Sequence, residues 1–85
     1  MTKRDKHYRQ LLRDPQRPLA FRDFITVIRD FGFVEIRIRG SHRSYKHPAA
    51  ATLLVVQPRG HDAKPYQQKQ FLDMIEEYGL ERPTE

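Results

Sequence analysis

The sequence contains no cysteine, no long apolar run and no glycine-rich phosphate loop after a predicted strand. Without cysteine there is no disulfide framework and no cysteine-based zinc site. No apolar stretch approaches the roughly 20 residues of a membrane-spanning helix, and no signal-peptide core follows Met1. The usual nucleotide-binding motifs are also absent. We therefore expect one small cytoplasmic domain that requires no metal, no cofactor and no membrane.

Positive charge is present and is unevenly distributed. The formal net charge is +5 over 85 residues. Residues 1–17 carry six basic and two acidic side chains, and residues 37–69 carry seven basic side chains against Asp62 alone. Residues 70–85 have a net charge of −4. A basic region attracts phosphate backbones whatever the base sequence, although lysine and arginine are also common on any soluble surface.

Two segments have apolar residues at helical spacing, and each is bounded by residues typical of helix ends. Residues 18–31 carry the apolar stripe Phe21, Phe24, Ile25, Ile28 and Phe31. Pro18 suits the first turn of this helix, and Gly32 suits the position after its end. Residues 65–78 carry the stripe Phe71, Met74, Ile75 and Tyr78, with Lys64-Pro65 before it and Gly79 after it. We predict two amphipathic helices that bury these stripes.

Residues 33–39 and 42–47 predict a β-hairpin around Gly40-Ser41. Val34, Ile36 and Ile38 alternate with charged residues, which is the period of a strand with one buried face. Glycine at the first turn position suits a type II′ turn. Counting outward from a two-residue turn pairs Arg39 with His42, Ile38 with Arg43, Arg37 with Ser44, Ile36 with Tyr45 and Glu35 with Lys46. This register places Ile36, Ile38 and Tyr45 on the core side, and it places Arg37, Arg39, His42, Ser44 and Lys46 on the open side.

A third strand at residues 52–56 completes the predicted fold. We expect an α+β two-layer sandwich in the order α-β-β-β-α, with a three-stranded antiparallel sheet and both helices on one face. Residues 18–79 would form this domain, and residues 80–85 an acidic tail. Residues 1–17 form a basic extension that is either a flexible arm or a weakly ordered terminus.

The order of these motifs resembles a known family. A helix ends in Gly32-Phe33, a strand leads to Gly40-Ser41-His42, and a short strand closes with Tyr45 and His47-Pro48. This arrangement is similar to the HicA toxins of bacterial toxin–antitoxin pairs, which are small ribonucleases with a double-stranded-RNA-binding-domain-like fold. The extension has no counterpart in that pattern. Tyr66-Gln67-Gln68 also replaces the small residues usual at the start of the last helix.

The resemblance implies that His42 is the catalytic residue, since the family carries its catalytic histidine in the Gly-Ser-His position. On the predicted register His42 lies opposite Arg39, with Arg37 diagonal to it, and these cations favour a neutral imidazole that can accept a proton. His42 would take the proton of a ribose 2′-hydroxyl, which then attacks the adjacent phosphate. None of the four histidines has the spacing of a metal site.

The remaining residues of the predicted site bind RNA. Arg37, Arg39 or Lys46 would hold the phosphate and stabilise its developing charge. The predicted RNA-binding set also includes Gly40, Ser41, Arg43 and Lys64. Ser41 is interpreted first as a turn residue. The donor of a proton to the leaving oxygen is left open between His61 and Lys64.

Three functions from different classes fit this sequence. The leading hypothesis is an mRNA-cleaving toxin neutralised by a HicB-like antitoxin protein. The second is a non-catalytic RNA-binding module that uses the same basic face. The third is a protein-interaction domain whose basic face docks an acidic partner.

Overall fold

The predicted α+β fold with a three-stranded antiparallel sheet is confirmed, and an additional helix precedes it. The computed structural model describes residues 3–82, and side chains from residue 5 onward. The elements are α1 (Lys3–Arg13), α2 (Phe21–Asp30), β1 (Val34–Arg39), β2 (His42–Lys46), β3 (Leu54–Val56) and α3 (Pro65–Tyr78). The strand order is β1-β2-β3, with both pairings antiparallel. No helix in residues 3–82 is long and apolar enough to cross a membrane.

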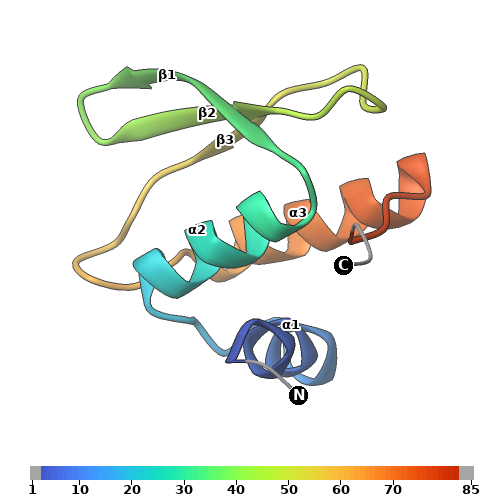
Figure 1. Cartoon of the computed structure of the whole chain (residues 1–85). Helices are drawn as coiled ribbons and strands as arrows, with labels where there is room; N and C mark the ends of the chain where they lie inside the picture. Colours follow the sequence, from blue (N-terminus) through green and yellow to red (C-terminus); the bar gives the residue numbers. More distant parts are fainter. Residues whose placement is uncertain (1–2, 83–85) are drawn as a thin grey trace.

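The elements form three layers (Figure 1). The sheet is the first layer, α2 and α3 lie together beneath one of its faces, and α1 lies on the far side of α2 from the sheet. The sheet contributes three fully buried side chains to the core, Tyr45, Leu54 and Val56. All three come from β2 and β3, and so the edge strand β1 contributes little to the core.

Phe71 of α3 joins the layers at the centre of the core. Its ring centroid lies 5.8 Å from that of Phe24, 5.5 Å from that of Phe31 and 5.8 Å from that of Phe33. Each of these phenylalanines is at most 3% exposed. Burying a side chain of this size contributes roughly 1.5–3 kcal/mol. This aromatic cluster therefore holds α3 against both α2 and the start of β1.

Most of the N-terminal extension that the structure describes forms the packed helix α1, which corrects the expectation of a flexible arm or a weakly ordered end. Leu11 is fully buried, and the ring of Tyr8 meets that of Phe31 edge-on at 4.9 Å. Val27 is only 1% exposed although it lies outside the predicted stripe of α2. It shares an i, i+4 row with Asp23 and Phe31, and α1 reaches both ends of this row. Met1 and Thr2 lie outside the described residues.

A buried glutamine fixes the segment that joins α1 to α2. Gln68 of α3 has no exposed surface, and its Oε1 accepts a hydrogen bond of 2.8 Å from the backbone of Leu19. Its Nε2 donates to the carbonyl oxygens of Pro15 and Arg17, at 3.1 and 3.0 Å. Three backbone groups of the connection therefore depend on one side chain. The glutamine that departs from the family's pattern thus contacts the segment that the pattern lacks.

The remaining element boundaries lie within three residues of the prediction. α2 begins at Phe21 rather than Pro18 because the preceding chain pairs with the β3–α3 loop, where Phe21 donates to the His61 carbonyl at 2.8 Å. β3 begins at Leu54 rather than Thr52. α3 begins at Pro65 and ends at the left-handed Gly79, as predicted. In the predicted acidic tail, Leu80 is buried and Arg82 forms an ion pair with Asp5, while residues 83–85 lie outside the described part.

Candidate functional site

The hairpin turn has the predicted geometry. Gly40 and Ser41 separate the two strands, Gly40 has a φ of 60°, and Ser41 does not take a positive φ. A positive φ at the first turn residue alone distinguishes a II′ turn from a I′ turn. The three pairs nearest the turn are confirmed: Arg39 with His42, Ile38 with Arg43, and Arg37 with Ser44.

Farther from the turn the predicted register is wrong because β1 contains a bulge. The pairing shifts between Glu35 and Arg37, so that Ile36 is an extra residue. Glu35 therefore lies opposite Tyr45, and Val34 lies opposite Lys46. The predicted core positions of Ile36 and Ile38 are also wrong, since their exposed fractions are 51% and 57%. The helices cover β2 and β3, and edge strand β1 buries none of its side chains fully.

Glu35 and Tyr45 hold the bulge in place, and sequence reasoning missed this pair. The Tyr45 hydroxyl donates a hydrogen bond of 2.9 Å to Glu35 Oε1. The guanidinium groups of Arg29 and Arg43 each approach the same oxygen to 4.0 Å. Burial raises the pKa of Tyr45, and the bond to Glu35 raises it further. The strict apolar alternation of β1 placed Glu35 on the open side and gave no sign of this contact.

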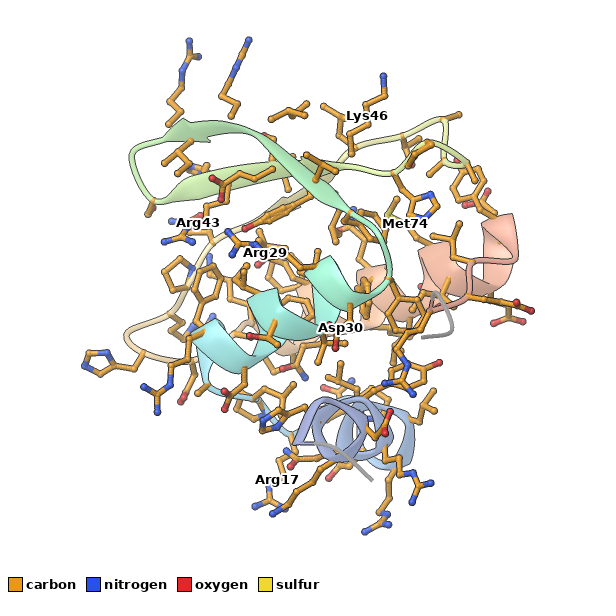
Figure 2. All side chains as sticks on the ribbon, in the orientation of Figure 1. Arg17, Arg29, Asp30, Arg43, Lys46 and Met74 are labelled. Carbon is orange, nitrogen blue, oxygen red and sulfur yellow. The ribbon has the colours of Figure 1, made fainter. Side chains whose placement is uncertain are left out.

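The helices leave one face of the sheet uncovered, and we call it the open face. Directly opposed strand residues share a face, so the pairings assign its members. These are Val34, Arg37, Arg39, His42, Ser44, Lys46 and Val55. His42 and the three cations are exposed. Figure 2 shows Lys46 pointing away from the helices. The structure therefore brings four of the predicted site residues together on one solvent-facing surface, with Gly40 and Ser41 at its end.

Apolar side chains are also exposed at the open face, and the sequence did not predict them. Val34 is 61% exposed and Val55 39%. The bulge residue Ile36 and Leu53, which precedes β3, are exposed to 51% and 44%. Exposed apolar groups beside polar ones are typical of protein interaction sites. The open face therefore offers a partner both positive charge and apolar surface.

Three predicted residues lie outside the open face. Arg43 is on the opposite side of β2, where its guanidinium carbon lies 5.5 Å from the ring centroid of Phe21. Lys64 immediately precedes α3, and its Nζ lies 6.0 Å from the ring of Tyr66. His61 is in the β3–α3 loop beside the start of α2. Arg43 and Lys64 thus do not join the other cations, and neither candidate proton donor lies on the face that carries His42.

A groove of about 470 Å³ lies near the start of α2. It is lined by Ala20, Phe21, Arg22, Pro58, Gly60 and His61. It is formed by the helix layer and the β3–α3 loop, away from the open face. Among the described residues, no three histidine, cysteine, aspartate or glutamate side chains gather where they could hold a metal ion.

Comparison with known proteins identifies the family. Residues 21–79 match the family described as the HicA toxin of bacterial toxin–antitoxin systems. The matched region runs from α2 to the end of α3 and includes the hairpin with His42, whereas α1 lies outside it. No curated protein and no solved structure gave a match. The match covers well over half of the chain, and the protein therefore belongs to the HicA toxin family.

Proposed function

We propose that this protein is an endoribonuclease toxin that cleaves mRNA in the cytoplasm without a metal ion. HicA toxins are generally ribonucleases. The observation that carries the proposal is the position of His42, exposed beside a tight turn and on the same face as Arg37, Arg39 and Lys46. A base that reacts with a polymer must be accessible, and cations around it attract the phosphate on which the reaction occurs.

In the proposed reaction His42 acts as the general base. Its imidazole takes the proton of a ribose 2′-hydroxyl, and the resulting oxygen attacks the neighbouring phosphorus. The bond to the 5′-oxygen of the next nucleotide breaks, which leaves a 2′,3′-cyclic phosphate. The 5′-oxygen takes a proton from solvent, which reaches the open face freely. DNA lacks the 2′-hydroxyl, and the protein binds it without cleaving it.

The cations of the open face hold and stabilise the phosphate. Arg39 is directly opposite His42, and Arg37 is two pairs farther from the turn on the same face. A guanidinium group can donate two parallel hydrogen bonds to phosphate oxygens, which fixes the phosphate as well as neutralising it. Lys46 lies at the other end of the hairpin and contacts a more distant phosphate. These charges stabilise the transition state more than the ground state because negative charge builds up on the phosphate oxygens.

The partner that neutralises this toxin is a HicB-like antitoxin seated on the open face. Family membership implies a toxin–antitoxin context with an antitoxin partner. The open face combines three exposed cations with exposed Val34 and Val55. A protein with carboxylates around an apolar centre matches this surface. Such a partner blocks RNA and covers His42 at the same time.

The test compares two exposed histidines. His42→Ala removes the proposed base, and His61→Ala removes a histidine that lies away from the open face. Both changes are at exposed positions and should alter stability by less than about 0.5 kcal/mol. We expect the wild type and His61→Ala to cleave single-stranded RNA in buffer with a metal chelator, and His42→Ala to lose cleavage and growth arrest. Equal cleavage by His42→Ala would refute the assignment.

The second candidate, a non-catalytic RNA-binding module, rests on the same three exposed cations. It predicts that the wild type binds RNA and leaves it intact under every condition tested. It also predicts that Arg39→Ala weakens binding more than His42→Ala does, because the arginine is a permanent cation that contacts phosphate. RNA that stays intact after prolonged incubation with excess wild-type protein would favour the binding module over the enzyme.

A further inference from the structure

We infer that α1 carries a second RNA-binding surface, separate from the open face, that recognises the phosphate backbone without regard to base sequence. It consists of Lys6, Arg9, Arg13 and Arg17, which we call the α1 basic face. The inference relies on the proposed function only in taking RNA as the polyanion. It concerns a segment that precedes the matched family region.

The four side chains form one exposed row. All four are exposed. Positions 6, 9 and 13 recur at i, i+3 and i+7, which places them within a narrow sector of a helix surface. They span about 10 Å along the axis at 1.5 Å per residue. Arg17 follows the turn after α1 and lies on the same side of the molecule (Figure 2). A row of this length can contact several consecutive phosphates of one strand.

The charges of this row are not neutralised by the protein itself. Within residues 5–82, no ion pair involves any of the four side chains. The nearby carboxylates have other contacts: Asp5 pairs with Arg82, and Asp14 Oδ1 accepts a hydrogen bond from the backbone of Gln16. The cations therefore remain available for an external anion.

The row is also rigidly presented. Leu11 and Tyr8 fix the inner side of α1 to the core, and Gln68 binds the chain on either side of Gln16. A surface already ordered in the free protein loses little conformational entropy on binding. A flexible arm of the same charge would lose more. Because α1 is packed rather than flexible, its cations can bind RNA at a smaller entropic cost.

The two basic surfaces lie on opposite sides of the molecule. Figure 2 shows Arg17 at the α1 side and Lys46 at the sheet side. The sheet, α2 and α1 are stacked in that order, and the axes of two packed helices lie about 8–10 Å apart. Because α2 lies between them, the open face and the α1 basic face are separated by more than the Debye length, which is about 8 Å at physiological salt. The α1 basic face therefore acts independently, and it stays accessible when a partner covers the open face.

The chemistry of α1 favours a phosphate backbone over a membrane surface. An amphipathic helix that lies in a membrane interface must expose its apolar side to lipid. The apolar side of α1 is instead occupied by the core through Leu11 and Tyr8. Leu12 is the large apolar side chain that this helix exposes, at 55%. A single leucine beside several cations does not supply an insertion surface.

The experiment measures RNA affinity without cleavage. Every protein carries His42→Ala so that the RNA stays intact. The test variant adds Lys6→Gln, Arg9→Gln and Arg13→Gln, and a charge-matched control instead adds Arg22→Gln, Arg59→Gln and Lys69→Gln. Glutamine has nearly the helix propensity of lysine and arginine, so the fold should persist. Fluorescence anisotropy with a labelled single-stranded RNA of mixed sequence gives the affinity over a range of salt concentrations.

We expect the test variant to bind about tenfold more weakly than its parent at low salt, and the control to lose about threefold or less. For single strands the slope of log affinity against log salt is about −0.7 per phosphate contact, so three lost contacts should reduce it by about 2. Leu12→Gln should leave the affinity unchanged. Equal losses in the test and control variants would overturn the inference, as would a loss caused by Leu12→Gln.

This result is distinguishable from failure of the proposed enzyme. If the wild type does not cleave RNA but the test variant shows the selective loss, the enzyme is refuted and the α1 surface stands. If the wild type cleaves RNA and the test and control variants bind equally, the enzyme stands and the α1 surface is refuted. Arg17 lies outside any helix, and Arg17→Gln should cause a smaller loss of RNA affinity with the same salt dependence. An unchanged affinity for Arg17→Gln would remove that residue from the surface and contradict the row as defined.

Discussion

One hydrogen bond determines which residue of β1 lies opposite Tyr45. Tyr45 is fully buried, and its hydroxyl reaches Glu35 only because Ile36 bulges out of the ladder. The pairs between the bulge and the turn keep Arg37, Arg39 and His42 on one face. A regular ladder would put Ile36 opposite Tyr45 and bring an isoleucine, rather than a carboxylate, toward the buried hydroxyl. The polar pair therefore fixes the register beyond the bulge, where Glu35 faces the core and Val34 the open face, whereas the turn fixes the register of Arg37 and His42.

Tyr45→Phe tests this contact through its effect on the free energy of unfolding. Loss of the hydroxyl removes a hydrogen bond to a charged group and should cost about 1.5–3 kcal/mol at neutral pH. Burial, then the bond to Glu35, raises the pKa of Tyr45 in the folded protein. Its contribution to stability is therefore fully present below the unfolded pKa of about 10, and is lost as pH rises through the higher folded value.

Urea denaturation between neutral pH and strongly alkaline pH measures both effects. The wild type should lose stability as pH rises above about 10, and Tyr45→Phe should lack this component of the loss. Tyr66→Phe is the matched control because Tyr66 is 61% exposed. A Tyr45→Phe protein that is as stable as the wild type at neutral pH would contradict the role given to the hydrogen bond.

At the scale of elements, α1 was only partly predictable. Tyr8, Leu11 and Leu12 have the i, i+3, i+4 spacing of one helix side, and Pro15 lies two residues after the last residue of α1. The sequence did not show which surface of the domain this helix packs against. The signal was Val27, an apolar residue outside the main stripe of α2, which a helix on the outer side of α2 would explain. A single valine off a stripe is common on protein surfaces, so this signal was too weak to use.

Leu11→Ala tests the docking of α1. Leu11 has no exposed surface, so its truncation should leave a cavity and cost about 2–5 kcal/mol of unfolding free energy. Leu12→Ala, one residue away and 55% exposed, should change it by less than about 0.5 kcal/mol. Chemical denaturation of both variants measures the difference. Equal, small effects would mean that α1 does not pack on α2 in solution.

The register of the hairpin was also only partly predictable from the sequence. The turn and the three pairs beside it followed from Gly40-Ser41, because a two-residue loop fixes local register. The bulge did not follow, because Val34, Ile36 and Ile38 alternate as a regular half-buried strand would. The alternation was a poor guide to burial here. Both β1 and β3 are edge strands, but α3 packs against β3, whereas the apolar side chains of β1 remain exposed. Which edge strand a helix covers depends on contacts that are distant in sequence.

At the scale of the whole molecule, two groups of exposed cations, on the open face and on the α1 basic face, lie on opposite sides. Counting charge along the chain located both basic segments, residues 1–17 and residues 37–69. It could not assign single residues to a surface, because a strand alternates sides and a loop can lead to another layer. Arg43 and Lys64 illustrate this, since both belong to the basic segment and neither lies on the open face. If both proposals hold, this separation lets an antitoxin cover one side while the other still holds RNA.

The claim that His42 cleaves RNA through a ribose 2′-hydroxyl is tested most directly with a modified substrate. Two RNAs of identical sequence are compared, one of them with 2′-deoxyribose at the position cut in the other. The account predicts that the wild-type protein binds both RNAs with similar affinity and cleaves only the unmodified one, leaving 2′,3′-cyclic phosphate ends that mass spectrometry detects. Cleavage of the modified RNA at the same bond, or products of the unmodified RNA that end in a 3′-hydroxyl, would contradict it.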